Sequence, residues 1–412
     1  MLAWAQMTEA SSDYLDAAGA ATFLGVTKAT LYSYVSRGMI ASVALGVGAR
    51  KKGYRRSDLL ALKHRTSFRK DPDTAATEVI EFGTPILTTS ISQITEAEHS
   101  YRDRSSSELA ARYTFEQVAQ FLWTGEVEGN GSPPDLLPQS ELWRQPTDVR
   151  LGSGLPADLS PVERLQAVLP LMERRDLHAY GAKAAVLMPA AVRILLQLTH
   201  FSAGRPYAGS LAATLASAWG VDAAKLDALL VMVADHELNI ATFTARCVAS
   251  AGATLYQAVL GGLAALQGYK HLYGQVAEAR GFFAEVVDEG QAAPVVRRYL
   301  RLRGVVPGFH NPYRRLYAGH DPRVATLVEL LAGSDLYPLL RETLQVAEAA
   351  TGEHPRVDFA LAVAEPLLGL PEDAIFSLIA LGRTAGMIAH VFEQYGSARV
   401  IRPRARYVGG AG

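Results

Sequence analysis

The fold is decided by residues 233–274, which read VADHELNIATFTARCVASAGATLYQAVLGGLAALQGYKHLYG. Apolar residues recur through this stretch at the spacing of an α-helix. It places His236 at the head of one helical pattern and His271 at the end of another. Glycines between the two histidines allow neighbouring helices to approach closely. The stretch therefore predicts closely packed helices with histidines near their ends.

The helical signal extends in both directions from this stretch. Toward the N-terminus, residues 106–126 open with a cap-like serine, recur apolar at helix spacing and end in Thr-Gly. The best candidate for a strand is TPILTTSISQI, residues 84–94. We therefore expect a body that is mainly α. The other segments with a helical pattern are 161–174, 180–199, 207–218, 222–234, 241–267, 271–288, 323–333, 335–350, 357–364 and 372–393.

Composition excludes several classes of protein. The 412 residues carry a net charge of −1, which indicates no general preference for nucleic acid or membrane surfaces. Cys247 is the one cysteine, so no intrachain disulfide can form, as is usual in a reducing compartment. No uncharged apolar run reaches the roughly 18 residues of a membrane span, and no signal peptide is evident. We expect a cytoplasmic protein without a membrane partner, and no Cys/His spacing predicts a metal site.

The N-terminal part of the chain is unusually basic. Residues 21–70 hold eleven Lys and Arg side chains against one acid, Asp58. Residues 14–40 read as two short helices joined by a Gly25-Val26 turn, with Thr27 able to cap the second helix. Residues 48–63 read as a basic wing followed by a helix. The sequence thus predicts a small winged helix-turn-helix domain over residues 12–66 and a linker over 67–79.

This N-terminal domain resembles those of the MerR and excisionase type, in which the second helix enters the major groove and the wing grips phosphate. A solvated basic face without a ligand is the alternative. The candidate DNA-binding residues are Lys28, Thr30, Tyr32, Ser33, Arg37, Arg50, Lys51, Lys52, Arg55 and Arg56.

Short motifs follow later in the chain. They read PGFHNPY (307–313), DPR (321–323), HPRVDFAL (354–361), GRTAGMIAHVFEQ (382–394) and RVIRPRARYVG (399–409). With residues 90–126 and 233–274 they resemble, in order, the citrate synthase family. The typical family patterns are DHELNAST, GPLHGGA, PGFGHPLY, DPR, NVDFALA, RTAGWIAHALEQ and IRPRARYVG. The resemblance covers about residues 80–412 and implies a large helical domain (80–274 and 366–412) and a small one (275–365).

The resemblance implies that an acyl-CoA, as a substrate and without a further cofactor, is condensed with oxaloacetate. This chemistry needs a carboxylate base, a donor to the enolate oxygen and cations for a dianion. By position, Asp358 resembles the base and His271 the donor to the thioester carbonyl. A surface acid and a core histidine are the alternatives. The residues that resemble oxaloacetate ligands are His236, Arg323, Arg383 and Arg402, the last given by the partner subunit of a homodimer.

Two motifs depart from the family patterns. GPLHGGA becomes GYKHLYG, so Leu272 and Tyr273 replace small residues and could fill the acyl site. PGFGH becomes PGFHN, so Asn311 takes the position of a catalytic histidine unless the loop slips and His310 serves instead. An amide can donate a hydrogen bond but cannot carry a proton. The residues expected to line the CoA cleft are Pro307, Gly308 and Phe309.

Three interpretations of the whole chain follow. The first is a citrate synthase-like acyltransferase with an appended DNA-binding-type domain. The second is a ligand sensor with weakened catalysis that regulates transcription through its helix-turn-helix domain, and a dimeric body suits a palindromic operator. The third is a partner subunit that completes a heteromeric synthase. The surviving substrate-binding positions favour the first.

Overall fold

The computed structural model describes residues 14–40, 42–44, 52–55, 59, 62, 87–95, 97–126, 147–148, 150–310, 320–397 and 399–405. The chain divides into two compact units, residues 1–88 and 89–412, and each is treated by itself. The predicted linker and four of the predicted site residues lie outside the described residues. These four are Arg50, Lys51, Arg56 and Asn311.

The first unit places two short helices beside a three-stranded antiparallel sheet in the order β1-β3-β2. Asp16 caps α1 by accepting a hydrogen bond from the Gly19 N–H at 2.7 Å. Gly25, with φ of +65°, ends α1, and the Thr27 side chain then caps α2. The elements are β1 (Tyr14–Asp16), α1 (Ala17–Leu24), α2 (Lys28–Ser36), β2 (Ser42–Ala44) and β3 (Lys52–Arg55).

Several of the predicted DNA-binding side chains are at the surface of this unit. Lys28, Arg37 and Lys52 are exposed, and the Tyr32 ring is 51% exposed. Thr30 and Ser33 are half-buried. The unit has a small core of its own, formed by Ala20, Ala21, Leu31, Ile40, Tyr54, Leu59 and Leu62.

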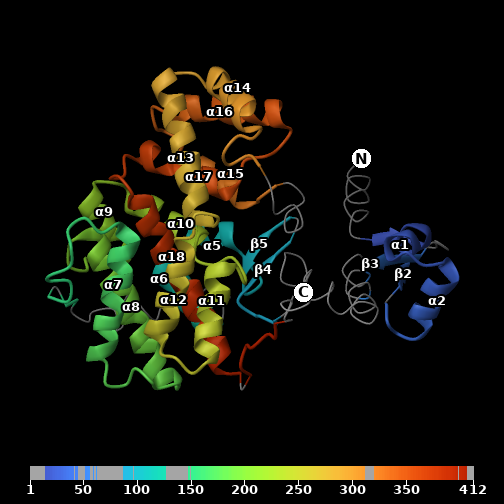
Figure 1. Ribbon diagram of the computed structural model, residues 1–412, viewed down its shortest axis with the longest axis horizontal. Helices are drawn as coiled ribbons and strands as arrows, with labels where there is room; N and C mark the ends of the chain where they lie inside the picture. Colours follow the sequence, from blue (N-terminus) through green and yellow to red (C-terminus); the bar gives the residue numbers. More distant parts are fainter. Residues whose placement is uncertain are drawn as a thin grey trace, which may run out of the picture. The chain divides into compact units, whose positions relative to one another are not determined.

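The second unit, here called the body, is mainly α, as the sequence predicts (Figure 1). Its one described sheet is antiparallel with the order β4-β5-β6. The elements are β4 (Ser92–Ile94), β5 (His99–Tyr101), β6 (Arg104–Ser105), α5 (Ser106–Arg112), α6 (Phe115–Thr124), α7 (Pro161–Arg175), α8 (Ala184–Ala203), α9 (Leu211–Trp219), α10 (Ala223–Met232), α11 (Ile240–Ser250), α12 (Leu255–Leu266), α13 (Leu272–Glu289), α14 (Ala292–Arg303), α15 (Arg323–Leu330), α16 (Tyr337–Thr351), α17 (Val357–Leu368) and α18 (Ala374–Tyr395).

Two of the predicted helical segments are each divided in two. The pattern over 241–267 becomes α11 and α12, because Gly252 adopts a φ of +81° and Thr254 forms a capping box that starts a new helix. The pattern over 106–126 becomes α5 and α6, because Thr114 forms a second capping box. Apolar spacing continues across both breaks, so the caps, not the periodicity, set the boundaries.

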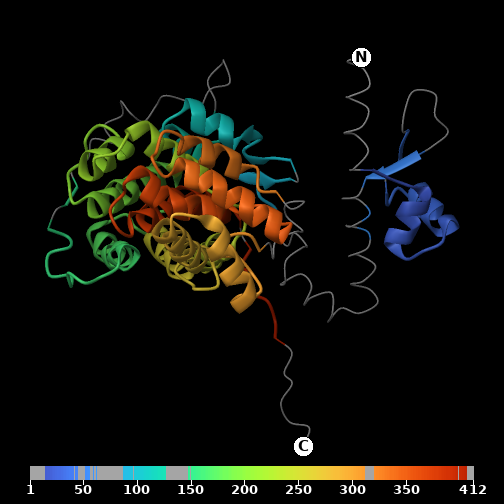
Figure 2. The ribbon, with the colours of Figure 1, turned by 90° about the horizontal axis from the view of Figure 1, so that it is seen from above.

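Helix α18 is the central helix of the body. It packs against α6, α8, α10, α11, α12 and α17, and Figure 2 shows it in red among these helices. Two helical stretches are long and apolar enough to cross a membrane, Ala185–Ala203 and Ala374–Tyr395. In the second, 94% of the apolar 18-residue stretch is buried inside the body. Gly386 lets α18 approach closely, and its N–H donates to the Ala234 carbonyl at 3.0 Å. This contact fixes the segment that follows α10.

The helices α13 and α17 pack side by side and lead to α14 and α16 at one end of the body (Figure 1). The N-terminal ends of α13 and α17 carry His271 and Asp358. The fold therefore brings residues from distant parts of the sequence to one region.

Candidate active site

A buried carboxylate, that of Asp235, holds the segment between α10 and α11 in place. Asp235 accepts hydrogen bonds from the Ser92 hydroxyl and from the Glu237 N–H, the latter at 2.9 Å. His390 of α18 also contacts it, with 3.2 Å between Nε2 and Oδ2. Glu237 takes a φ of +52°, which a non-glycine residue adopts only where the surroundings hold it. This network fixes the backbone on both sides of His236.

The His236 ring stacks on the ring of His99 from β5. Their centroids are 5.7 Å apart and their planes differ by 20°. His99 is 1% exposed, and its Nδ1 lies 3.0 Å from the Ser106 hydroxyl. Burial, followed by the charges of Arg323 and Arg383, lowers the pKa of both histidines well below the usual range. Both rings are therefore neutral at pH 7.

The two arginines come from different helices. Arg323, the first residue of α15, is 1% exposed and forms an ion pair with Asp321, with 2.7 Å between Nη2 and Oδ2. Arg383, in the middle of α18, is 4% exposed. Both charges act on His99 and His236, so the four groups belong to one buried site. Two buried guanidinium groups suit a ligand with two carboxylates.

His271 lies at the N-cap of α13 and belongs to the same electrostatic site. Burial, followed by the charge of Arg383, lowers the pKa of this imidazole to about 4. The ring is therefore neutral at pH 7 and can donate one hydrogen bond.

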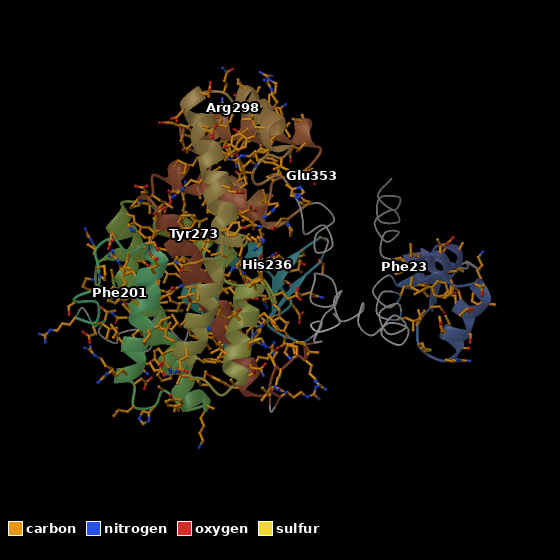
Figure 3. All side chains as sticks on the ribbon, in the orientation of Figure 1. Phe23, Phe201, His236, Tyr273, Arg298 and Glu353 are labelled. Atoms are coloured by element: carbon orange, nitrogen blue, oxygen red, sulfur yellow. The ribbon has the colours of Figure 1, made fainter. Side chains whose placement is uncertain are left out.

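The two large residues after His271 turn away into packing contacts. Leu272 is buried in the main core, and Tyr273 stacks on Phe376 of α18 with 4.0 Å between ring centroids. Figure 3 labels Tyr273 and His236, which lie on separate elements of the body. The stacking gives the Tyr273 ring a partner at the first turn of α18.

Asp358 lies in the first turn of α17 and is 1% exposed. Burial raises the pKa of this carboxyl, the charge of Arg356 opposes the rise, and Asp321 adds to it. The Arg356 Nε lies 2.9 Å from Asp358 Oδ1. A carboxylate with a raised pKa in a dry position is a stronger base than one in water.

The predicted CoA residues lie in a loop that touches α17. Pro307, Gly308 and Phe309 are buried, and the Phe309 ring lies 4.9 Å from that of Phe359. Gly308 has a φ of +82°, and its backbone passes so close to Phe359 that a Cβ would lie 2.5 Å from the Phe359 Cβ. Glycine is thus required at this position on two counts.

The predicted site residues fall into two groups. His236, His271, Arg323 and Arg383 act on one another, and Asp358 is linked to them through Asp321, the partner of Arg323. The His310 ring and Arg402 are exposed in the single chain. Among the described residues no cluster of His, Cys, Asp or Glu could hold a metal ion.

Sequence reasoning missed two residues of this site. No sequence motif pointed to His99. It lies in the short strand β5, 137 positions before His236 in the chain. Arg356 did leave a signal, since it stands where the pattern NVDFALA has asparagine.

Comparison with known proteins identifies the family of the body. Residues 81–404 match the sequence profile described as citrate synthase, C-terminal domain. The chain belongs to the citrate synthase family. The match excludes most of the first unit, so it bears on the body alone, and it confirms the predicted enzyme class and helical fold for that part of the chain.

Relatives and solved structures of this family cover most of the body. A 2-methylcitrate synthase 2 of Corynebacterium glutamicum is 27% identical over 75% of this chain and 88% of its own. A 2-methylcitrate synthase of Mycobacterium tuberculosis is 28% identical over 79% and 89%. The crystal structure of citrate synthase from Thermotoga maritima matches 80% of this chain and 94% of its own, with a TM-score of 0.64 and 24% identity.

Proposed function

We propose that this protein condenses an acyl-CoA with oxaloacetate, giving citrate or a homologue and free CoA. The observation that carries the proposal is the gathering of two buried arginines and three neutral imidazoles near the start of the helix that bears Asp358. The CoA thioester is a substrate, and the reaction requires no further cofactor.

In the proposed reaction, Asp358 removes a proton from the carbon next to the thioester carbonyl. The neutral His271 ring donates a hydrogen bond to the enolate oxygen, which stabilises charge where it develops. The enolate carbon then attacks the ketone carbon of oxaloacetate, the ketone double bond becomes a single bond, and its oxygen gains a proton that balances the one Asp358 removed. Water hydrolyses the resulting thioester, and CoA leaves as a thiol. The raised pKa of Asp358 and the lowered pKa of His271 suit these two roles.

Oxaloacetate is proposed to lie against Arg323 and Arg383, whose guanidinium groups can each bind a carboxylate in two places. His236 is proposed to donate to the ketone oxygen, held in place by its stack on His99. Relatives named 2-methylcitrate synthases support propionyl-CoA as an acyl donor alongside acetyl-CoA.

The test is release of thiol from acetyl-CoA and propionyl-CoA, with and without oxaloacetate. We expect oxaloacetate-dependent release, and Asp358→Asn should reduce it by about 10²–10⁴-fold, the usual contribution of a general base. Asp288→Asn, at an exposed acid on α13, is the matched control and should leave the rate unchanged. The proposal would be refuted by thiol release at the same rate without oxaloacetate, or by an unchanged rate in Asp358→Asn.

We also propose that the body is a homodimer in which Arg402 completes the partner's site. The support is that this arginine belongs to the predicted ligand set yet is exposed in the single chain. Mixing inactive Asp358→Asn and Arg402→Ala chains should restore part of the activity, because some mixed dimers then hold one intact site. Failure to restore any activity, with dimers present, would contradict this arrangement.

A second candidate function belongs to the first unit, which we propose is a winged helix-turn-helix domain that binds DNA. It is favoured by the exposed Lys28, Tyr32 and Arg37 on or next to α2, after the turn at Gly25. Binding to duplex DNA should weaken as salt rises, because released counterions drive it. The double variant Lys28→Ala, Arg37→Ala should lose affinity, and equal affinity would argue against the proposal.

A further inference from the structure

Arg356 contacts four groups around the proposed base. Its backbone N–H donates to the Gly308 carbonyl at 2.8 Å. Its Nη1 donates to the His310 carbonyl and its Nη2 to Gln275 Oε1, both at 2.7 Å. Its Nε pairs with Asp358 Oδ1 at 2.9 Å. One side chain thus joins α17, α13 and residues 304–310, which we call the cleft loop.

The geometry of these contacts restrains both the loop and the carboxylate. A guanidinium group is planar, so fixing Nη1 and Nη2 also fixes where Nε lies. Nε stands 2.9 Å from Asp358 Oδ1, and the two groups form an ion pair without a hydrogen bond. The Arg356 side chain is 13% exposed and that of Asp358 is 2% exposed, so water screens the pair only weakly. The position of the cleft loop and the orientation of the base are therefore set by the same group.

We propose that Arg356 is a positioning residue that clamps the cleft loop onto α17 and holds Asp358 by Oδ1, so that Oδ2 faces the acyl substrate. The catalytic half of this inference rests on the proposed function. The clamp itself rests only on the contacts between Arg356, the cleft loop and α13.

Two departures from the family patterns meet in this contact. Arg356 replaces the asparagine of NVDFALA, and His310 replaces a glycine of PGFGH. The arginine binds the backbone carbonyl of that same His310, which is itself exposed. A longer side chain at the start of α17 therefore reaches the loop in which the second change lies.

The clamp has a consequence for pH dependence. The pKa of Asp358 is raised by burial and by Asp321, and the charge of Arg356 lowers it. Removing that charge raises the pKa further, so the acid limb of kcat/KM should move to higher pH. Helix α17 packs against α13, α15 and α18. The charged or titratable groups of the proposed site on these helices are His271 of α13, Arg323 of α15 and Arg383 of α18, and the cleft loop adds His310.

The experiment compares the full-length protein with Arg356→Ala, Arg356→Lys and the control Arg280→Ala. Arg280 also joins α13 to α17, through an ion pair with Glu365 at 3.0 Å, but it does not touch the loop. Two measurements are made on each protein. They are the pH profile of kcat/KM with acetyl-CoA and propionyl-CoA, and amide hydrogen exchange of residues 304–310.

We expect Arg356→Ala to lower kcat/KM by about 10²-fold, as a misplaced catalytic group does, and to shift the acid limb upward. Exchange in the cleft loop should accelerate, since the Arg356 clamp is lost. Arg356→Lys should keep the acid limb near its original pH, because an ammonium group keeps the positive charge. It should still lower kcat/KM, because an ammonium group lacks the planar set of N–H donors of a guanidinium group. Arg280→Ala should change neither the acid limb nor the exchange of residues 304–310.

Unchanged exchange in Arg356→Ala would overturn the clamp. A kcat equal to or above the original would overturn the positioning role and indicate that Arg356 restrains the base. If the unaltered protein releases no thiol, the proposed function fails and the catalytic half of the inference fails with it. The exchange comparison then still decides whether the clamp exists, because it requires no activity. Arg356→Lys supplies the same comparison if Arg356→Ala does not fold.

Discussion

At the scale of single residues, the neighbours of His271 determine its chemistry. Burial and Arg383 lower its pKa to about 4, so the ring stays neutral through the physiological range. The contribution of the neutral His271 ring to catalysis should be lost only as pH falls through about 4, where the ring gains a proton. We expect His271→Ala to lower kcat by about 10²–10³-fold, the usual effect of losing one donor to a developing oxyanion. His271→Gln, which keeps an N–H donor, should lose less, and an equal loss in both variants would contradict the donor role.

Gly308 allows a second prediction at the same scale. Alanine there must adopt a φ of +82° and place its Cβ 2.5 Å from that of Phe359. We expect Gly308→Ala to lower the free energy of unfolding by about 1–3 kcal/mol and to raise KM for acyl-CoA, because the cleft loop must move. Gly304→Ala is the control, with a φ of +71° and nothing within 4 Å of its Cβ. Denaturant unfolding should show the smaller loss for Gly304→Ala, and equal losses would mean that the contact with Phe359 costs nothing.

At the scale of elements, a buried and a half-buried carboxyl join α6 to its neighbours. Glu116 of α6 accepts from the Leu211 N–H at the start of α9 at 2.6 Å, and Asp227 of α10 accepts from the Phe115 N–H at 2.8 Å. Burial, with Asp227 nearby, raises the pKa of Glu116 to about 7. A carboxyl whose pKa is raised by folding favours the folded state when protonated, and this preference is lost as pH rises from about 4.5 to 7.

Glu116→Gln should therefore stabilise the body at high pH. The amide oxygen can still accept from Leu211, and no charge is buried. We expect a gain of up to about 3 kcal/mol in the free energy of unfolding at pH 8, shrinking toward zero near pH 4. Thermal or denaturant unfolding across this range measures it, with the exposed Glu278→Gln as control. A gain that does not change with pH would show that Glu116 titrates normally.

The sequence predicted elements better than it predicted the assembly of the site. Apolar spacing located most helices of the body, but the predicted segments do not include α14. The spacing also runs unbroken across Gly252 and Thr114, where backbone conformation and capping start new helices. The ordered motifs named His236, Arg323 and Arg383, and the fold brings these side chains into one electrostatic site. His99 could not be found in this way, because its role arises from a ring stack between distant segments.

At the scale of the whole molecule, the two units have separate hydrophobic cores. The core of the first unit draws on residues between Leu15 and Leu62, and that of the body on residues from Ile91 onward. Among the described residues, each core consists of side chains from its own unit. The body therefore has the apolar burial that an independently folded domain needs. The family match likewise begins at residue 81.

We therefore expect a chain without residues 1–80 to fold and to keep kcat/KM within about twofold of the full-length value, because independent sites perturb one another by only a few tenths of a kcal/mol. Its melting temperature should equal that of the body transition in the full chain. Salt-dependent DNA binding should disappear, since the proposed DNA-contacting side chains are removed with the first unit. A fall of tenfold or more in kcat/KM in a folded, shortened chain would show that the first unit acts on the catalytic site, and the regulatory interpretation would then gain its first support.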